Sequence, residues 1–188
     1  MRVTTALAIA GVLVFLSYEA VLRRRTDAAA SWQGDDADRS STRLIVVAYG
    51  AVVAINVVLG MASFGQIPPP WRWLGIGILV VGLALRAWAM TTLGRFYTRT
   101  LRTVDAQQLV EAGPYRAVRH PGYSASLLVW VGYAIALGSW IATILTIGVL
   151  GLVYLWRINA EETLLRASFG DRYAAYQQRT KRLVPFVY

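Results

Sequence analysis

The chain has 188 residues, 56% of them hydrophobic, and a formal net charge of +9 at pH 7. This apolar content exceeds what one soluble core of this size buries, so we interpret the chain as an integral membrane protein. The absence of cysteine excludes disulfides, thiolate metal sites and a cysteine nucleophile. The basic residues flank apolar segments and form no separate domain, which argues against nucleic-acid binding.

Apolar segments long enough to cross a membrane recur along the chain. A hydrocarbon core of roughly 30 Å requires about 20 helical residues. Three segments in the first half meet this requirement: 3–22, 44–64 and 71–93. The first is followed directly by three arginines and is long enough to span, so we expect a retained helix and not a cleaved signal peptide. In the third, Arg86 is expected to extend toward the nearer membrane interface.

The second half contains one apolar stretch that is too long for a single straight span. Residues 124–156 are 33 consecutive uncharged residues, interrupted by Gly138-Ser139-Trp140. This pattern predicts a tight hairpin of two short spans. Residues 164–178 then predict an amphipathic helix. The expected fold is therefore all-α and polytopic, with about five spans, of which the last two form the hairpin, and a cytosolic C-terminal helix.

The distribution of basic residues predicts the orientation of these spans. Sixteen of the 19 Lys and Arg residues fall in three segments that a five-span topology places on one side: 23–43, 94–122 and 157–188. Cytoplasmic loops carry such an excess of positive charge, so we expect an external N-terminus and a cytoplasmic C-terminus. The two opposite connections, near 66–71 and 138–140, are short and nearly uncharged, and we expect them to be plain connectors.

Residues 113–123 form the densest polar cluster and include the chain's single histidine, His120. Proline suits the first turn of a helix, so Pro121 is expected to open the fourth span and to leave His120 beside its N-terminus. Such a helix end favours anions, including carboxylates. The alternative is a basic juxtamembrane loop whose Arg116 and Arg119 lie among lipid headgroups.

A second polar cluster, residues 157–162, follows the last apolar stretch. Arg157 and Glu161 are four residues apart, which places them on one face of a continuing helix. A simple ion pair explains this spacing, with a stabilisation of only about 0.3 to 0.5 kcal/mol in water. However, the adjacent carboxylates of Glu161 and Glu162 are costly to bury without partners, so a ligand or an arginine is expected to neutralise at least one of them.

Taken in order, these features resemble the isoprenylcysteine carboxyl methyltransferase family over roughly residues 100–188. The pattern is also similar to that of phospholipid N-methyltransferases. The residues that carry the resemblance are Arg119-His120-Pro121-x-Tyr123, the apolar hairpin, Arg157-x-x-x-Glu161-Glu162, Phe169-Gly170-x-x-Tyr173-x-x-Tyr176 and Pro185.

The resemblance implies a single membrane methyltransferase domain over 1–188, in which 1–93 supplies three spans and 94–188 binds S-adenosylmethionine beneath the C-terminal segment. It implies Arg157 as a catalytic, substrate-facing arginine. Glu162 is a second candidate substrate contact, because an amine acceptor would have to lose a proton that Glu162 or His120 could take, whereas a carboxylate acceptor needs no general base. It implies no metal. The expected cofactor contacts, carried over by matching position, are Gln107, Gln108, Leu109, Val110, Tyr115, His120, Pro121, Gly122, Tyr123 and Glu161.

Two positions depart from the family pattern: Gln107 stands where histidine is common, and Ala125 where glycine is usual. The expected acceptor is a lipophilic small molecule or a lipidated substrate, methylated on a carboxylate, with membrane lipids as further partners. The composition indicates a prokaryotic cell membrane with the site facing the cytoplasm. The alternatives are an NADPH-dependent membrane sterol or enone reductase, whose sequences look similar over the same region, and a non-catalytic membrane scaffold.

Overall fold

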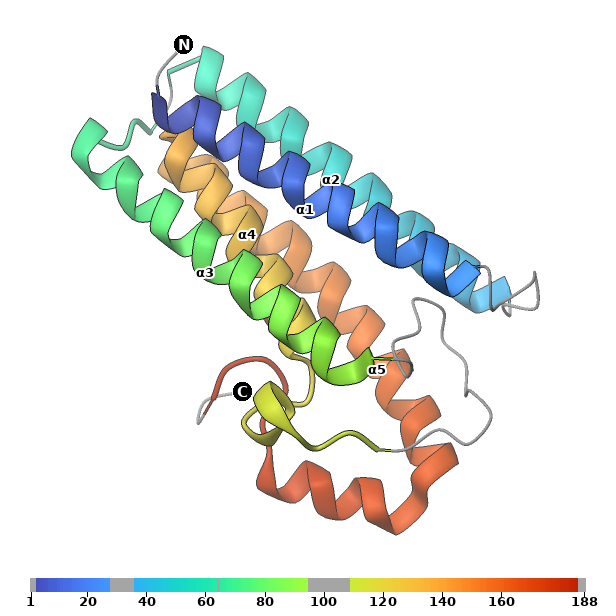
Figure 1. Ribbon diagram of the computed structural model, residues 1–188. Helices are drawn as coiled ribbons and strands as arrows, with labels where there is room; N and C mark the ends of the chain where they lie inside the picture. Colours follow the sequence, from blue (N-terminus) through green and yellow to red (C-terminus); the bar gives the residue numbers. More distant parts are fainter. Residues whose placement is uncertain (1–2, 28–35, 64, 95–108, 186–188) are drawn as a thin grey trace.

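The computed structural model describes residues 3–27, 36–63, 65–94 and 109–185, and within them the fold is a bundle of long helices (Figure 1). The helices, in chain order, are α1 (Val3–Asp27), α2 (Asp36–Met61), α3 (Pro69–Leu93), the short 3₁₀ helix η2 (Gly113–Arg116), α4 (Pro121–Leu137) and α5 (Trp140–Arg179). The predicted all-α, polytopic fold is thus confirmed.

Four of the described helices, α1, α2, α3 and α5, are long and apolar enough to cross a membrane. The fifth apolar helix, α4, has only 17 residues, or about 25 Å of helix. It is the most enclosed of the five, because α3, α1 and α5 all pack against it. Its side chains, including the fully buried Trp130, supply much of the core.

Helices α3 and α4 approach each other through glycines. A Cβ added at Gly75 would lie 2.5 Å from the backbone nitrogen of Ala136, and one at Gly132 would lie 2.5 Å from that of Leu79. Small residues allow helix backbones to come this close in membranes, where dispersion contacts drive association. This packing places the beginning of α4 directly beside the last turns of α3.

Helices α4 and α5 form the predicted hairpin. Gly138 ends α4 in the left-handed conformation, with a φ of 96°, and the Ser139 side chain caps α5 by accepting a hydrogen bond from the Ala142 N–H. The two connections that were predicted to be plain connectors are hydrogen-bonded to each other. Ile67 N donates to Gly138 O at 2.8 Å, and Trp140 N donates to Gly65 O at 2.9 Å. The two connections therefore close one end of the bundle together.

The C-terminal helix differs from its predicted bounds of 164–178. No glycine or proline lies between Trp156 and Phe169, so α5 continues without interruption from the apolar hairpin into the polar region. It breaks at Gly170, whose φ is 51° and ψ is −129°, and then runs to Arg179 in a new direction. Figure 1 shows this last part lying across the end of the bundle, beside η2.

Candidate active site

The polar site lies where three segments meet at the end of the bundle: the turn that opens α4, the middle of α5 and residues 180–183. The last of these runs parallel to residues 118–120, with a bridge between Val118 and Lys181. His120 N donates to Arg182 O at 3.0 Å, and Ser124 Oγ donates to Leu183 O at 2.6 Å. The C-terminal segment is therefore bonded to the turn that precedes and opens α4.

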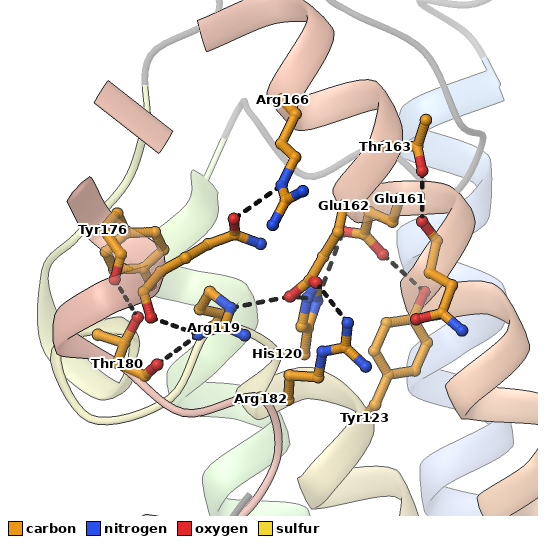
Figure 2. Close-up of polar contacts among 12 residues, drawn as sticks. Arg119, His120, Tyr123, Glu161, Glu162, Thr163, Arg166, Tyr176, Thr180 and Arg182 are labelled. Atoms are coloured by element: carbon orange, nitrogen blue, oxygen red, sulfur yellow. Dashed lines mark hydrogen bonds and ion pairs between the residues drawn. The ribbon is translucent and has the colours of Figure 1, made fainter. Parts of the chain in front are cut away.

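Glu162 is the centre of a buried charge cluster (Figure 2). Arg119 Nε donates to its Oε1 at 2.8 Å, and Arg182 donates to its Oε2 at 3.0 Å. His120 Nε2 lies 3.3 Å from Oε1. The Glu162 side chain is only 6% exposed, so these partners compensate the cost of removing the carboxylate from water.

This cluster also affects the ionisation of Glu162, which lies beyond Trp156, the last residue of the apolar stretch. Burial alone would raise the pKa of the Glu162 carboxyl, but hydrogen bonds from His120 and Arg119 outweigh that effect and hold the pKa at about 2. Glu162 is therefore a carboxylate at neutral pH and acts as the counter-ion of the two arginines.

Glu161 has a different environment although it is the next residue along α5. Its side chain is 33% exposed, and His120 Nδ1 lies 3.9 Å from its Oε1. The Tyr123 hydroxyl donates to its Oε2 at 3.0 Å, and Figure 2 shows this tyrosine pointing toward Glu161 from the first turn of α4. The Glu161 side chain thus keeps accessible surface, whereas the Glu162 side chain is almost fully buried.

Arg157 is 3% exposed and lies one helical turn before Glu161. The Tyr123 hydroxyl donates to Glu161, and the Arg157 guanidinium lies close enough to the same hydroxyl to interact with it electrostatically. The Tyr123 ring also packs against Tyr154, with 5.3 Å between ring centroids. The guanidinium of Arg157 and the carboxylate of Glu161 therefore meet at one tyrosine, at the boundary between the apolar bundle and the polar end.

The structure brings some of the predicted site residues together and places others nearby. His120, Tyr123, Arg157, Glu161 and Glu162 form one cluster, with Pro121 and Gly122 buried in the turn that carries Tyr123. Tyr115 packs instead with Ala89, Met90 and the half-buried Val110, and its carbonyl accepts a hydrogen bond from Tyr176. Leu109 is half-buried. Gln107 and Gln108 lie outside the described residues.

Pro121 opens α4 as predicted, but the helix end is less available to an anion than the sequence suggests. The backbone N–H groups of Tyr123 and Ser124 both donate to the His120 carbonyl, at 3.1 and 3.3 Å. A bound carboxylate therefore has to find other donors or displace these bonds.

Two arginines of the site were not predicted from the sequence. The sequence places Arg119 in the family motif and suggests a contact to lipid headgroups, but its side chain is 9% exposed and points to Glu162. Its position beside His120 was a usable signal. Arg182 reaches Glu162 from 20 residues along the chain, and nothing in its local sequence indicates this contact.

The fold defines a multi-span α-helical membrane protein with a cluster of arginines and carboxylates at one end. Residues 70–172 match the family model described as phospholipid methyltransferase. The chain is 33% identical to protein-S-isoprenylcysteine O-methyltransferase B of Arabidopsis thaliana, over 78% of each chain. It is also 33% identical to a probable enzyme of that name from Oryza sativa, over 66% of this chain and 67% of the relative. The chain belongs to the isoprenylcysteine carboxyl methyltransferase family.

A solved structure supports the fold. The eukaryotic intramembrane Ras methyltransferase, an isoprenylcysteine carboxyl methyltransferase, superposes with a TM-score of 0.65 at 22% identity, covering 76% of this chain. The chain spans about half the length of that protein, 52%. Family membership confirms the prediction of a membrane methyltransferase and decides against the reductase and scaffold alternatives.

Proposed function

We propose that this enzyme transfers the methyl group of S-adenosylmethionine to a carboxylate of a lipid-like or isoprenoid acceptor. The observation that carries the proposal is the meeting of Arg157 and Glu161 at the Tyr123 hydroxyl. One site thereby offers a partner for an ammonium group and, one helical turn away, a partner for a carboxylate.

The chemistry of these residues fits the ammonium end of the methyl donor. Glu161 is ionisable, partly exposed and fixed in direction by Tyr123, so its carboxylate can accept charge-assisted hydrogen bonds from the ligand. In this proposal residues 94–188 form the donor-binding half. Val110 and Tyr115 contribute from the edge of the site, and Gln107 to Leu109 contribute from the segment that precedes them.

When bound, S-adenosylmethionine supplies a methyl group on a sulfonium, which an acceptor carboxylate oxygen attacks in line while the sulfur takes the bonding electrons. Arg157 orients the acceptor, because a planar guanidinium binds both oxygens of a carboxylate in a defined direction. Arg157 and Tyr154 are buried, so water is excluded around them and these electrostatic contacts are strengthened. A carboxylate is already ionised at neutral pH, so no side chain has to act as a general base.

The geometry favours an indirect role for Glu162, which the sequence suggests as a substrate contact. Its two oxygens already accept from Arg119 and Arg182, and His120 lies against one of them. We assign it to holding the C-terminal segment and the turn that opens α4 on α5, which keeps His120 and Tyr123 in place.

Two relatives carry names that describe methylation of isoprenylated cysteine, which supports an acceptor with an apolar chain next to a carboxylate. We propose a lipophilic small molecule or a lipidated substrate that reaches the site from the membrane, with the site on the cytoplasmic side of a prokaryotic cell membrane. The clustering of basic residues at this end of the bundle supports that orientation.

The test is to incubate the purified enzyme in membranes with S-adenosylmethionine labelled on its methyl group, together with lipid, small isoprenoid or prenylated peptide fractions. We expect label in an isoprenoid or lipidated acceptor, in a bond that mild base hydrolyses as an ester. Base-stable label would indicate an amine acceptor. Titration calorimetry with S-adenosylmethionine, and with NADPH as a control, tests the donor: binding of NADPH alone would overturn the proposal.

A further inference from the structure

A buried ion pair joins two membrane-spanning helices near the site. Arg86 on α3 donates from Nε to Oε1 of Glu19 on α1 at 2.8 Å. Its Nη2 lies 2.7 Å from the same oxygen. The two side chains are only 10% and 15% exposed. The Arg86 side chain is therefore held inside the bundle by a partner on α1. Charged side chains inside membrane spans are costly, and those that persist are commonly paired and functional.

The same arginine also binds the backbone of the site. Arg86 donates from its other terminal nitrogen to the carbonyl of Gly122 at 2.9 Å, which also accepts from Ser126 Oγ at 3.0 Å. A Cβ added at Gly122 would lie 2.7 Å from Arg86, so the guanidinium packs directly against the chain there. Gly122 immediately precedes Tyr123 in the first turn of α4.

We propose that Arg86, oriented by Glu19, is a positioning residue for methyl transfer. It fixes the first turn of α4 relative to α3 and α1, and through the Gly122 carbonyl it sets the position of Tyr123. The inference rests on the proposed function, because it assigns a role to the geometry of that site.

The distances in the site show why such positioning matters. The Tyr123 hydroxyl lies 3.0 Å from Glu161 and His120 lies 3.3 Å from Glu162, so a shift of about 1 Å in the turn takes both contacts beyond hydrogen-bond range. A misplacement of that size distant from the reacting atoms lowers turnover by as much as about a hundredfold.

A matched control exists on the same helix. Arg72 on α3 is also buried, at 3% exposed, and it donates to Ile67 O at 2.9 Å and to the Gln66 side chain at 3.1 Å. These contacts lie at the opposite end of the bundle, beside the α4–α5 connection. A lysine at position 72 disturbs a buried arginine of α3 without acting on the turn that carries Tyr123.

The experiment compares purified Arg86→Lys, Arg86→Met, Glu19→Gln and Arg72→Lys with the parent enzyme. For each we would measure the Tm, the Kd for S-adenosylmethionine by calorimetry, and kcat and KM for the acceptor. A lysine keeps the charge but cannot hold a carboxylate and a carbonyl in the geometry of the arginine fork. We expect Arg86→Lys to lower kcat about tenfold and to raise the Kd for S-adenosylmethionine. Arg86→Met should change both quantities more, and Glu19→Gln should change them less. Arg72→Lys should change only the Tm.

The outcomes separate this inference from the function on which it rests. Folded Arg86→Lys protein with the kcat and donor Kd of the parent would overturn the positioning role, as would equal losses in Arg72→Lys. If neither Arg86 variant folds, Glu19→Gln decides in the same way, and unchanged donor binding and kcat in that variant would overturn the inference. If the parent enzyme itself binds no S-adenosylmethionine, the proposed function fails and not the role of Arg86.

Discussion

At the scale of single residues, adjacent positions on α5 have been given different environments. Glu161 and Glu162 carry identical carboxyl groups, but Glu162 is enclosed by Arg119, His120 and Arg182, whereas Glu161 retains exposed surface beside Tyr123. Successive helical residues point about 100° apart, so one carboxylate faces the C-terminal segment and the other faces Tyr123. An isosteric substitution at position 161 should therefore change donor binding more than stability, and one at position 162 should change stability more than donor binding.

Glu161→Gln is expected to weaken S-adenosylmethionine binding while leaving the Tm nearly unchanged. The substitution removes the charge that we propose pairs with the ligand ammonium, but glutamine fits the helix equally well and can still accept from Tyr123. Calorimetry and a thermal melt on the same preparation measure both effects. A Kd equal to that of the parent would return Glu161 to a structural role.

Glu162→Gln is expected to show the reverse pattern. It leaves Arg119 and Arg182 without their carboxylate, and loss of one member of a buried ion pair costs on the order of 3 kcal/mol. We expect a clear fall in Tm and increased proteolysis of the segment after Thr180, with donor binding retained at temperatures where the variant is folded. A stable variant that no longer methylates its acceptor would instead support a direct substrate contact.

The substitution Arg157→Lys distinguishes two roles for Arg157: a simple ion pair, and bidentate binding of the acceptor carboxylate. If Arg157 only balances a neighbouring carboxylate, lysine supplies the same charge and activity is retained. If it orients the acceptor, lysine cannot reproduce the planar fork. We expect near-normal donor binding and a loss of roughly tenfold or more in turnover, equivalent to about 1.4 kcal/mol of transition-state stabilisation. Initial rates and the donor Kd, measured together, provide the comparison, and an equal loss of both would contradict the assignment.

At the scale of helices, the contact between α3 and α4 sets the position of the first turn of α4 beside α3. This contact depends on glycines. Gly132→Ala is expected to destabilise the protein by about 1 to 3 kcal/mol, because the new methyl group would lie 2.5 Å from the backbone of Leu79 and the helices would have to separate. Gly148→Ala on α5, where an added Cβ meets no atom within 4 Å, is the control. Thermal melts in detergent should show a loss only for position 132, and equal Tm values would contradict the close packing.

At the scale of the whole molecule, the ends of the bundle differ in charge and should face different compartments. Because the chain contains no cysteine, single cysteines can be introduced at the exposed positions Arg116, Arg179 and Trp71. A membrane-impermeant maleimide added to sealed inside-out vesicles should label positions 116 and 179 but not position 71, as the positive-inside rule predicts. Labelling of 116 and 179 from opposite sides would contradict the topology.

Much of this architecture follows from the sequence alone. Span length and hydropathy are local properties, so the boundaries of the first three spans and the hairpin at Gly138 could be predicted within a few residues, and the charge bias predicted which ends lie together. The ordered set of residues from Arg119 to Tyr176 was sufficient to predict the family. It also indicated four candidate site residues that the structure places in one cluster: His120, Tyr123, Arg157 and Glu161.

The tertiary structure decided which charged groups are partners. Glu19 and Arg86 are 67 residues apart, and Arg119 and Glu162 are 43 apart. No local pattern relates such positions, because their contact depends on how α1, α3, α4 and α5 pack. The different environments of Glu161 and Glu162 have the same origin: the sequence shows two equal carboxylates, and the docking of residues 180–183 and of the turn before α4 encloses one of them and leaves the other partly exposed.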